Sequence, residues 1–108
     1  SVTGVQTCAL PICPCIGPTA FEVGEDVLMA FQSQEYDLSG CFKPKTAGKW
    51  WADLAGLARH RLSHRGVNQV QGNDGTQAWC TFSNPEHFFS HRRDRISGRM
   101  AAGVALLA

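Results

Sequence analysis

Apolar residues recur at intervals of three and four from residue 23 onward, and this spacing predicts an amphipathic helix. The stripe consists of Val23, Val27, Leu28 and Phe31. Acidic residues crowd the start of the stretch, where the positive end of a helix dipole favours negative charge. We therefore expect a surface helix whose apolar side faces the core.

A stronger helical pattern occupies residues 50–65, where an apolar stripe opposes a charged face. Arg61 and Arg65 lie toward the end of this stretch, as the helix dipole favours. Gly66 supplies the left-handed residue that commonly ends a helix. The predicted core-facing stripe is made of Trp51, Leu54, Ala55, Ala58 and Leu62.

The segments between and after these helices predict connections and short strands. Residues 39–48 mix Gly, Lys and Pro without a sustained period, which is typical of a connection. Residues 67–71 predict a short strand, and the Gly-Asn-Asp-Gly sequence at 72–75 predicts a turn that leads to a second strand at 79–82.

Two further elements are expected near the end of the chain. Asn84 followed by Pro85 is typical of a helix start, and it predicts a short helix with Phe88 and Phe89 turned inward. Residues 99–107 are mostly small and aliphatic, which predicts a strand buried on both faces.

The composition is that of an ordinary globular domain. The chain has 108 residues, is 44% hydrophobic and 18% charged, and carries a formal net charge of +1, so long-range attraction gives no reason to expect nucleic acid as a partner. The apolar run at 100–108 is too short to span a bilayer. Five cysteines without a CxxC pair argue against a closed disulfide framework and favour a reducing cytoplasm.

Two histidine pairs, His60 with His64 and His87 with His91, have the four-residue spacing that helical metal ligands can have. Arg61 and Arg65 flank the first pair, where positive charge opposes a divalent ion. No glutamate lies between the members of the second pair, as metalloprotease chemistry would require. We therefore favour a structural role for both pairs.

Residues 88–95 place two phenylalanines beside three arginines and one aspartate. A guanidinium suits phosphate or carboxylate, and aromatic faces suit a flat base, so a small anionic or nucleoside substrate would fit here. The alternative is a surface cluster in which Asp94 partly neutralises its neighbours. Both interpretations stay open on the residues alone.

The first twelve residues, SVTGVQTCALPI, carry no charge and no clear period. Residues 2–12 resemble the translation of a common short-read sequencing adapter, whose last base would turn a glycine codon into that of Cys13. We therefore expect residues 1–12 to be adapter-derived and to pack poorly, and we give Cys8 and the Cys13–Cys15 pattern no metal role.

Three segments together resemble the end of the laccase-domain, or polyphenol oxidase, family. They are PCIGP at 14–18 with FEV at 21–23, the helix that ends before Gly66, and FFS at 88–90 with RRD at 92–94 and GRMA at 98–101. The resemblance implies a mixed-sheet α/β domain with helices outside the sheet. Residues 13–108 would form its C-terminal part, without the N-terminal half.

The family was named for multicopper polyphenol oxidation, and the resemblance implies a zinc-dependent purine nucleoside phosphorylase with adenosine deaminase activity. The family's metal-binding His, Cys and His would lie upstream of this chain, so no metal ligand or catalytic residue is assigned here. Arg92 and Arg93 match the family's Arg-Arg-Asp motif and are expected to bind substrate, one lining the pocket and the other supporting the fold. His91 stands where the family usually has tyrosine.

The resemblance therefore implies a chain that is inactive and marginally stable alone, because its apolar strand edges expect partners from the missing half. Purine nucleoside and phosphate would be the ligands of the intact protein. The alternatives are a small metal-binding protein that uses the histidine pairs, and a basic binding module that uses Arg92 and Arg93.

Overall fold

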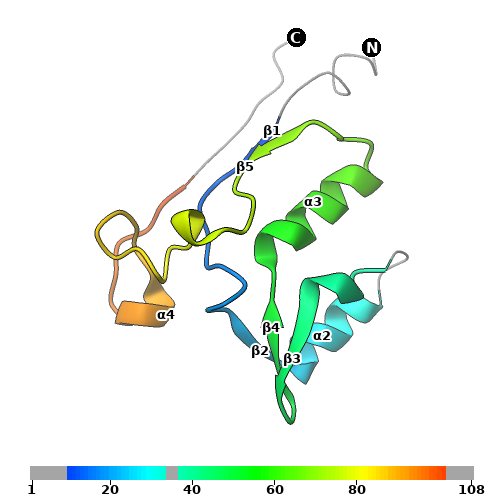
Figure 1. Cartoon of the computed structure of the whole chain (residues 1–108), viewed down its shortest axis with the longest axis horizontal. Coiled ribbons are helices and arrows are strands. Elements are labelled where there is room, and N and C mark those ends of the chain that lie inside the picture. Colours follow the sequence, from blue (N-terminus) through cyan, green and yellow to red (C-terminus); the bar gives the residue numbers. More distant parts are fainter. Residues whose placement is uncertain (1–9, 34–36, 102–108) are drawn as a thin grey trace.

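The computed structural model describes residues 10–33 and 37–101, which form a mixed α/β fold with helices outside two small sheets, as the family resemblance implied (Figure 1). Two 3-10 turns, at Ser39–Cys41 and Gln77–Trp79, supplement the regular elements. The strands are β1 (Leu10–Ile12), β2 (Glu22–Gly24), β3 (Phe42–Thr46), β4 (Lys49–Ala52) and β5 (Val70–Gly72), and the helices are α2 (Glu25–Gln32), α3 (Leu54–His64) and α4 (His91–Asp94).

The main core lies between helix α2 and a three-stranded antiparallel sheet of order β2-β4-β3. Val23 of β2 stands opposite Trp50 of β4, and Phe42 of β3 stands opposite Ala52. The expected apolar face of α2 is present, since Leu28 is buried and Val27 and Phe31 pack against the core. The buried cluster is Val23, Leu28, Leu38, Cys41, Phe42, Ala52 and Leu57.

The predicted helix at 50–65 was wrong in its first turn, because Trp50 and Trp51 belong to strand β4 and not to a helix. Strand β4 is central in its sheet, and hydrogen bonds to β2 and β3 on both sides outweigh the helical period of its side chains. Asp53 then starts α3, and its side chain accepts a hydrogen bond from the Gly56 backbone N–H at 3.0 Å.

The predicted end of this helix was confirmed. Gly66 has φ +86°, its N–H donates to the Ser63 carbonyl, and the Val67 N–H donates to the Leu62 carbonyl. These two bonds form a Schellman motif, in which buried Val67 supplies the apolar contact after the glycine. Ala55 is buried as predicted, but Leu57, outside the predicted stripe, is the more central core residue.

Two other boundaries were wrong at the same sheet. Val23 was predicted to lie in the helix, but it belongs to strand β2, and helix α2 begins two residues later, at Glu25. Residues 39–48 are not a plain connection, because they contain strand β3 and the turn to β4. Strand β3 is at the sheet edge, and lysine and proline are tolerated in edge strands, so its composition concealed it.

The second sheet is a parallel pair of β1 with β5, with Leu10 opposite Val70 (Figure 1). This pairing contradicts the expectation that residues 10–12 pack poorly. Backbone groups, which any sequence supplies, hold the two strands together. Gly72, expected in a turn, ends β5 with φ +91°, and the Asn73 N–H donates to the Ile12 carbonyl at 2.9 Å.

The strand predicted at 79–82 was wrong. Residues 77–79 form a 3-10 turn, residues 81–83 form another turn, and only Cys80 makes a bridge, to Cys15. The Asn84 side-chain amide donates to the Gln77 and Cys80 carbonyls, at 2.6 and 2.8 Å, and so closes this segment into a loop.

The helix predicted at Asn84 was also wrong, because residues 85–87 form a single turn that is not continued. Asn84 uses its amide to cap the preceding loop, and Phe89 is 54% exposed and not turned inward. Of the strand predicted at 99–107, residues 99–101 form no strand and are exposed, and residues 102–107 lie outside the described part of the chain.

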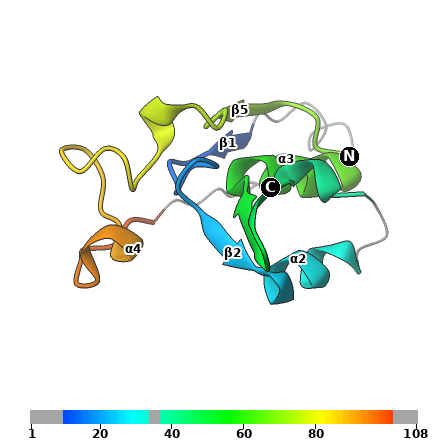
Figure 2. The same ribbon diagram turned by 60° about the horizontal axis from the view of Figure 1, so that its bottom comes forward.

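Helix α4 and the loop before it extend to one side of the molecule, away from helices α2 and α3 (Figure 2). Within residues 10–33 and 37–101, no helix has both the length and the apolar character needed to cross a membrane.

Replacing Gly72 with alanine is expected to destabilise the chain more than replacing Gly48. Both glycines have positive φ, which costs a residue with a side chain about 1–2 kcal/mol. A Cβ at Gly72 would also lie 2.5 Å from the Ile12 carbonyl oxygen, whereas a Cβ at Gly48 meets nothing within 4 Å. Urea unfolding of Gly72→Ala and Gly48→Ala measures the difference, and equal losses of stability would contradict the β1–β5 pairing.

Candidate functional site

The Arg-Arg-Asp segment forms helix α4, a single turn that begins at a buried serine. The Ser90 hydroxyl accepts a hydrogen bond from the Arg93 N–H at 3.4 Å, and the Ser90 carbonyl accepts one from the Asp94 N–H at 3.0 Å. Arg95, with φ +66°, ends the turn. Ser90 therefore fixes the direction in which the two arginines leave the backbone.

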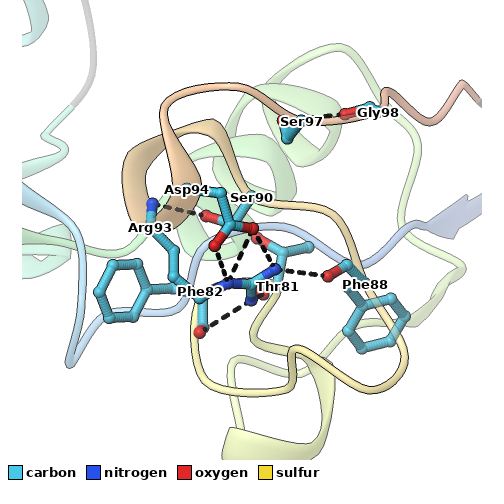
Figure 3. Close-up of polar contacts among 8 residues, drawn as sticks. All are labelled: Thr81, Phe82, Phe88, Ser90, Arg93, Asp94, Ser97 and Gly98. Atoms are coloured by element: carbon cyan, nitrogen blue, oxygen red, sulfur yellow. Dashed lines mark hydrogen bonds and ion pairs between the residues drawn. The ribbon is translucent and has the colours of Figure 1, made fainter.

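Arg93 points into the loop formed by residues 81–88 (Figure 3). Its Nη1 donates to the carbonyls of Thr81, at 2.7 Å, and Phe82, at 3.1 Å, and its Nη2 donates to the carbonyl of Phe88, at 2.9 Å. Nε and Nη2 also bind the Asp94 carboxylate, at 3.1 and 2.8 Å. All five N–H donors of the guanidinium thus have acceptors within the protein.

The ion pair with Asp94 strengthens this arrangement. The hydrogen bonds from Arg93 lower the pKa of the Asp94 carboxyl, and the same bonds raise the pKa of the Arg93 guanidinium. The Arg93 side chain is 18% exposed, so solvent reaches it only partly. Arg93 is therefore a structural residue that organises a loop lacking a regular strand ladder.

Arg92 points to a different part of the molecule. Its Nη1 donates to the Glu22 carbonyl at 2.9 Å, and its guanidinium carbon lies 5.3 Å from the centre of the Phe21 ring. The residue is exposed. The described residues supply no further hydrogen-bond acceptor for its other donors, so Arg92 can receive an external anion where Arg93 cannot.

An open cavity of about 430 Å³ lies next to helix α4, and neither Arg92 nor Arg93 is among its lining residues. Phe89 rests against Gly98 there, where a Cβ would come within 2.7 Å of the ring. Its lining also includes His91, Ser97 and Arg99. Sequence reasoning assigned Arg99 no role in binding, and the only signal for it was its place beside Gly98 in the GRMA segment.

The histidine pairs do not form a metal centre. His60, His64, His87 and His91 are all exposed, and His87 lies 3.8 Å from the Glu86 carboxylate. Among residues 10–33 and 37–101 no three His, Cys, Asp or Glu side chains are grouped closely enough to hold an ion. The side chains described here therefore do not fit a zinc or copper site.

Sequence reasoning missed a cysteine contact at the PCIGP segment. Cys80 is 1% exposed, and its sulfur accepts a hydrogen bond from the Gly17 N–H at 3.1 Å. Buried Asn73 donates to the Cys15 sulfur at 3.2 Å and to the Cys13 carbonyl at 3.1 Å. Cys15 and Cys80 are far apart in sequence, so only the folded chain shows that they are neighbours.

Comparisons with known proteins place this fold. The sequence profile of the family described as "Multi-copper polyphenol oxidoreductase laccase" matches residues 2–107. A Xylella fastidiosa protein named purine nucleoside phosphorylase is 46% identical over 88 residues, which are 82% of this chain and 33% of that protein. The Escherichia coli purine nucleoside phosphorylase YfiH is 44% identical over 94 residues, 87% of this chain and 37% of its own length.

Solved structures agree with the sequence relatives. Neisseria meningitidis protein NMB0706 superposes with a TM-score of 0.66 at 42% identity, over 78% of this chain and 32% of that one. Bacillus licheniformis protein YfiH superposes with a TM-score of 0.71 at 28% identity, over 79% and 32%. The chain spans about a third of the length of these relatives. It belongs to the multi-copper polyphenol oxidoreductase laccase family.

Proposed function

We propose that this chain is the C-terminal part of a purine nucleoside phosphorylase domain, in which Arg92 contacts phosphate or nucleoside and Arg93 holds the fold. The observation that carries the proposal is the division of roles between the two arginines. Every N–H donor of the Arg93 guanidinium binds an acceptor in the protein. Arg92 is exposed, and among the described residues its guanidinium donates only to the Glu22 carbonyl. The names of the relatives supply the substrate class.

Arg92 is suited to an anion that approaches from solvent. A charge-assisted hydrogen bond to a guanidinium is worth more than a neutral one, and its planar fork matches two phosphate oxygens. The Phe21 ring and the Glu22 carbonyl hold the side chain in place, so less conformational freedom is lost when it binds. Arg92 would therefore orient phosphate, and the chemistry at the glycosidic bond would fall to groups outside this chain.

Zinc and adenosine deamination belong to this proposal only through the rest of the domain. The described residues do not fit a metal site, so a bound zinc would depend on ligands from the rest of the domain. The chain covers about a third of its relatives, and we propose that it has no turnover by itself. We also propose that residues 1–12 derive from a sequencing adapter and that residues 13–108 are native. The intact protein would be cytoplasmic and would bind neither nucleic acid nor membrane.

A chimera tests the role of Arg92. Residues 13–108 are joined to the part of the Escherichia coli relative that this chain does not cover, and phosphorolysis of inosine is measured. Arg92→Ala is expected to lower kcat/KM by about 10- to 100-fold through the KM for phosphate, because one charge-assisted bond is lost. Arg92→Lys should recover part of the loss. Arg65→Ala, an exposed arginine on another helix end, should change nothing.

An unchanged KM for phosphate in Arg92→Ala would remove Arg92 from the site. The unfused chain is assayed in parallel for phosphorolysis of inosine and for deamination of adenosine. We expect neither reaction, and turnover by the unfused chain would overturn the proposal that the remaining length of the relatives is required.

Arg93 has a separate expected effect, on stability. Arg93→Ala leaves the carbonyls of Thr81, Phe82 and Phe88 without their donor, which should lower the free energy of unfolding more than the loss of a single surface hydrogen bond does. Urea unfolding of the same chimera measures this loss, with Arg92→Ala as the matched control, expected to lose less stability because only its hydrogen bond to the Glu22 carbonyl and its contact with the Phe21 ring are removed. Equal losses in the two variants would contradict the division of roles.

A further inference from the structure

Cys15 and Cys80 lie directly opposite each other across an isolated parallel β-bridge. The Thr81 N–H donates to the Cys15 carbonyl at 3.0 Å, which fixes this register. Neighbouring strands are about 4.7–4.9 Å apart, and disulfides need a Cα separation of roughly 4.4–6.8 Å. The backbone therefore already holds the two residues at a spacing suited to a disulfide.

The two side chains also share one face of the bridge. Residues directly opposite each other in a β-pairing project their side chains to the same side, so Cys15 and Cys80 share a face. A Cβ at Gly17 would lie 3.2 Å from the Cys80 sulfur, which places that sulfur beside Gly17, two residues after Cys15. The Cys15 sulfur now contacts Asn73 and the Cys80 sulfur contacts Gly17, so side-chain rotation would bring the sulfurs together.

The surroundings give the two sulfurs different reactivity. Burial alone would raise the pKa of the Cys80 thiol, but hydrogen bonds from the Ser83 hydroxyl and from the N–H groups of Gly17, Ser83 and Phe82 lower it overall. Burial raises the pKa of the Cys15 thiol, which remains partly exposed. Cys15 is thus the sulfur that a dissolved reagent can reach, and Cys80 is the better internal nucleophile.

We propose that Cys15 and Cys80 are a redox modification site that forms a reversible intramolecular disulfide by exchange with a small-molecule disulfide such as oxidised glutathione. In the first step the Cys15 sulfur attacks the reagent, forming a mixed disulfide and releasing one reduced glutathione. In the second step the Cys80 thiolate attacks the Cys15 sulfur and the second glutathione leaves, taking the proton that Cys80 gave up. Two thiols are oxidised, and one glutathione disulfide is reduced to two thiols.

The bond would tie the PCIGP segment to the loop that Arg93 organises. Thr81 and Phe82, whose carbonyls bind Arg93, directly follow Cys80. A cross-link between residues so far apart in sequence restricts the unfolded chain, so the oxidised protein should unfold at a higher temperature. This inference does not depend on the proposed enzymatic function.

The test uses the full chain with the competing thiols replaced, as Cys8→Ser and Cys13→Ser, and with Cys41 kept as an internal comparison. The folded protein is equilibrated in mixtures of reduced and oxidised glutathione, and free thiols are then alkylated. Combined cleavage at glutamate, lysine and arginine separates the three cysteines, because Glu22 and Glu25 lie between Cys15 and Cys41, and Lys45 and Arg65 lie between Cys41 and Cys80. Mass spectrometry without reduction then identifies the linked peptides.

We expect a Cys15–Cys80 peptide pair that dithiothreitol separates, together with a rise in the unfolding temperature on oxidation. Cys15→Ala and Cys80→Ser should abolish both effects, and Cys41→Ala should preserve both. Cys80→Ser keeps the side-chain size, and circular dichroism checks that it folds. Glutathione that stays on Cys15 without a cross-link would overturn the proposal. So would a cross-link to Cys41, or a cross-link that forms equally well in urea.

Discussion

A single guanidinium holds together the part of the molecule that lacks regular structure. The loop at 81–88 has no strand partner for its carbonyl groups, and buried carbonyls need donors. Arg93 supplies donors to three of them, and Ser90 and Asp94 hold Arg93 in place. Cys80 directly precedes two of the residues that Arg93 binds, and Arg92 directly precedes Arg93, so the same arrangement links the cysteine pair to the exposed arginine.

The sequence was a good guide where local chemistry decides the structure. The end of α3 followed from Gly66, whose positive φ few other residues tolerate, and the mixed α/β class followed from the family motifs. It failed where distant partners decide. Trp51 has helical spacing relative to the residues after it, yet pairing with β2 and β3 makes it part of strand β4. Strand β3 has the lysines and proline of a loop, because its exposed edge tolerates them.

The candidate site shows the same division. The Arg-Arg-Asp motif identified both arginines but could not separate their roles, because the acceptors that engage Arg93 come from residues 81–88 and the contacts of Arg92 come from Phe21 and Glu22. No local pattern shows those partners. The Cys15–Cys80 bridge was missed for the same reason, since its register depends on how two separate loops meet.

The PCIGP motif has a physical explanation in this fold. Gly17 passes so close to Cys80 that a Cβ would lie 3.1 Å from the cysteine Cβ, a tight contact that leaves little room for a larger residue. Asn73 completes the junction, because its side chain binds the Cys13 carbonyl and the Cys15 sulfur and also accepts the Gly75 N–H. A family motif that reads as a loop in the sequence is thus the meeting point of three chain segments.

The two edges of the antiparallel sheet are protected in different ways, and this affects how the chain would self-associate. On β3, Pro44 has no N–H to donate, the register shifts between Pro44 and Thr46, and Lys43 and Lys45 are exposed. On β2, Arg92 occupies the Glu22 carbonyl. Both features oppose the docking of another strand. In the second sheet, Pro11 of β1 likewise has no N–H to donate, whereas β5 contains neither proline nor lysine. Intermolecular strand addition would therefore begin at β5 and leave Arg92 and Arg93 outside the growing assembly.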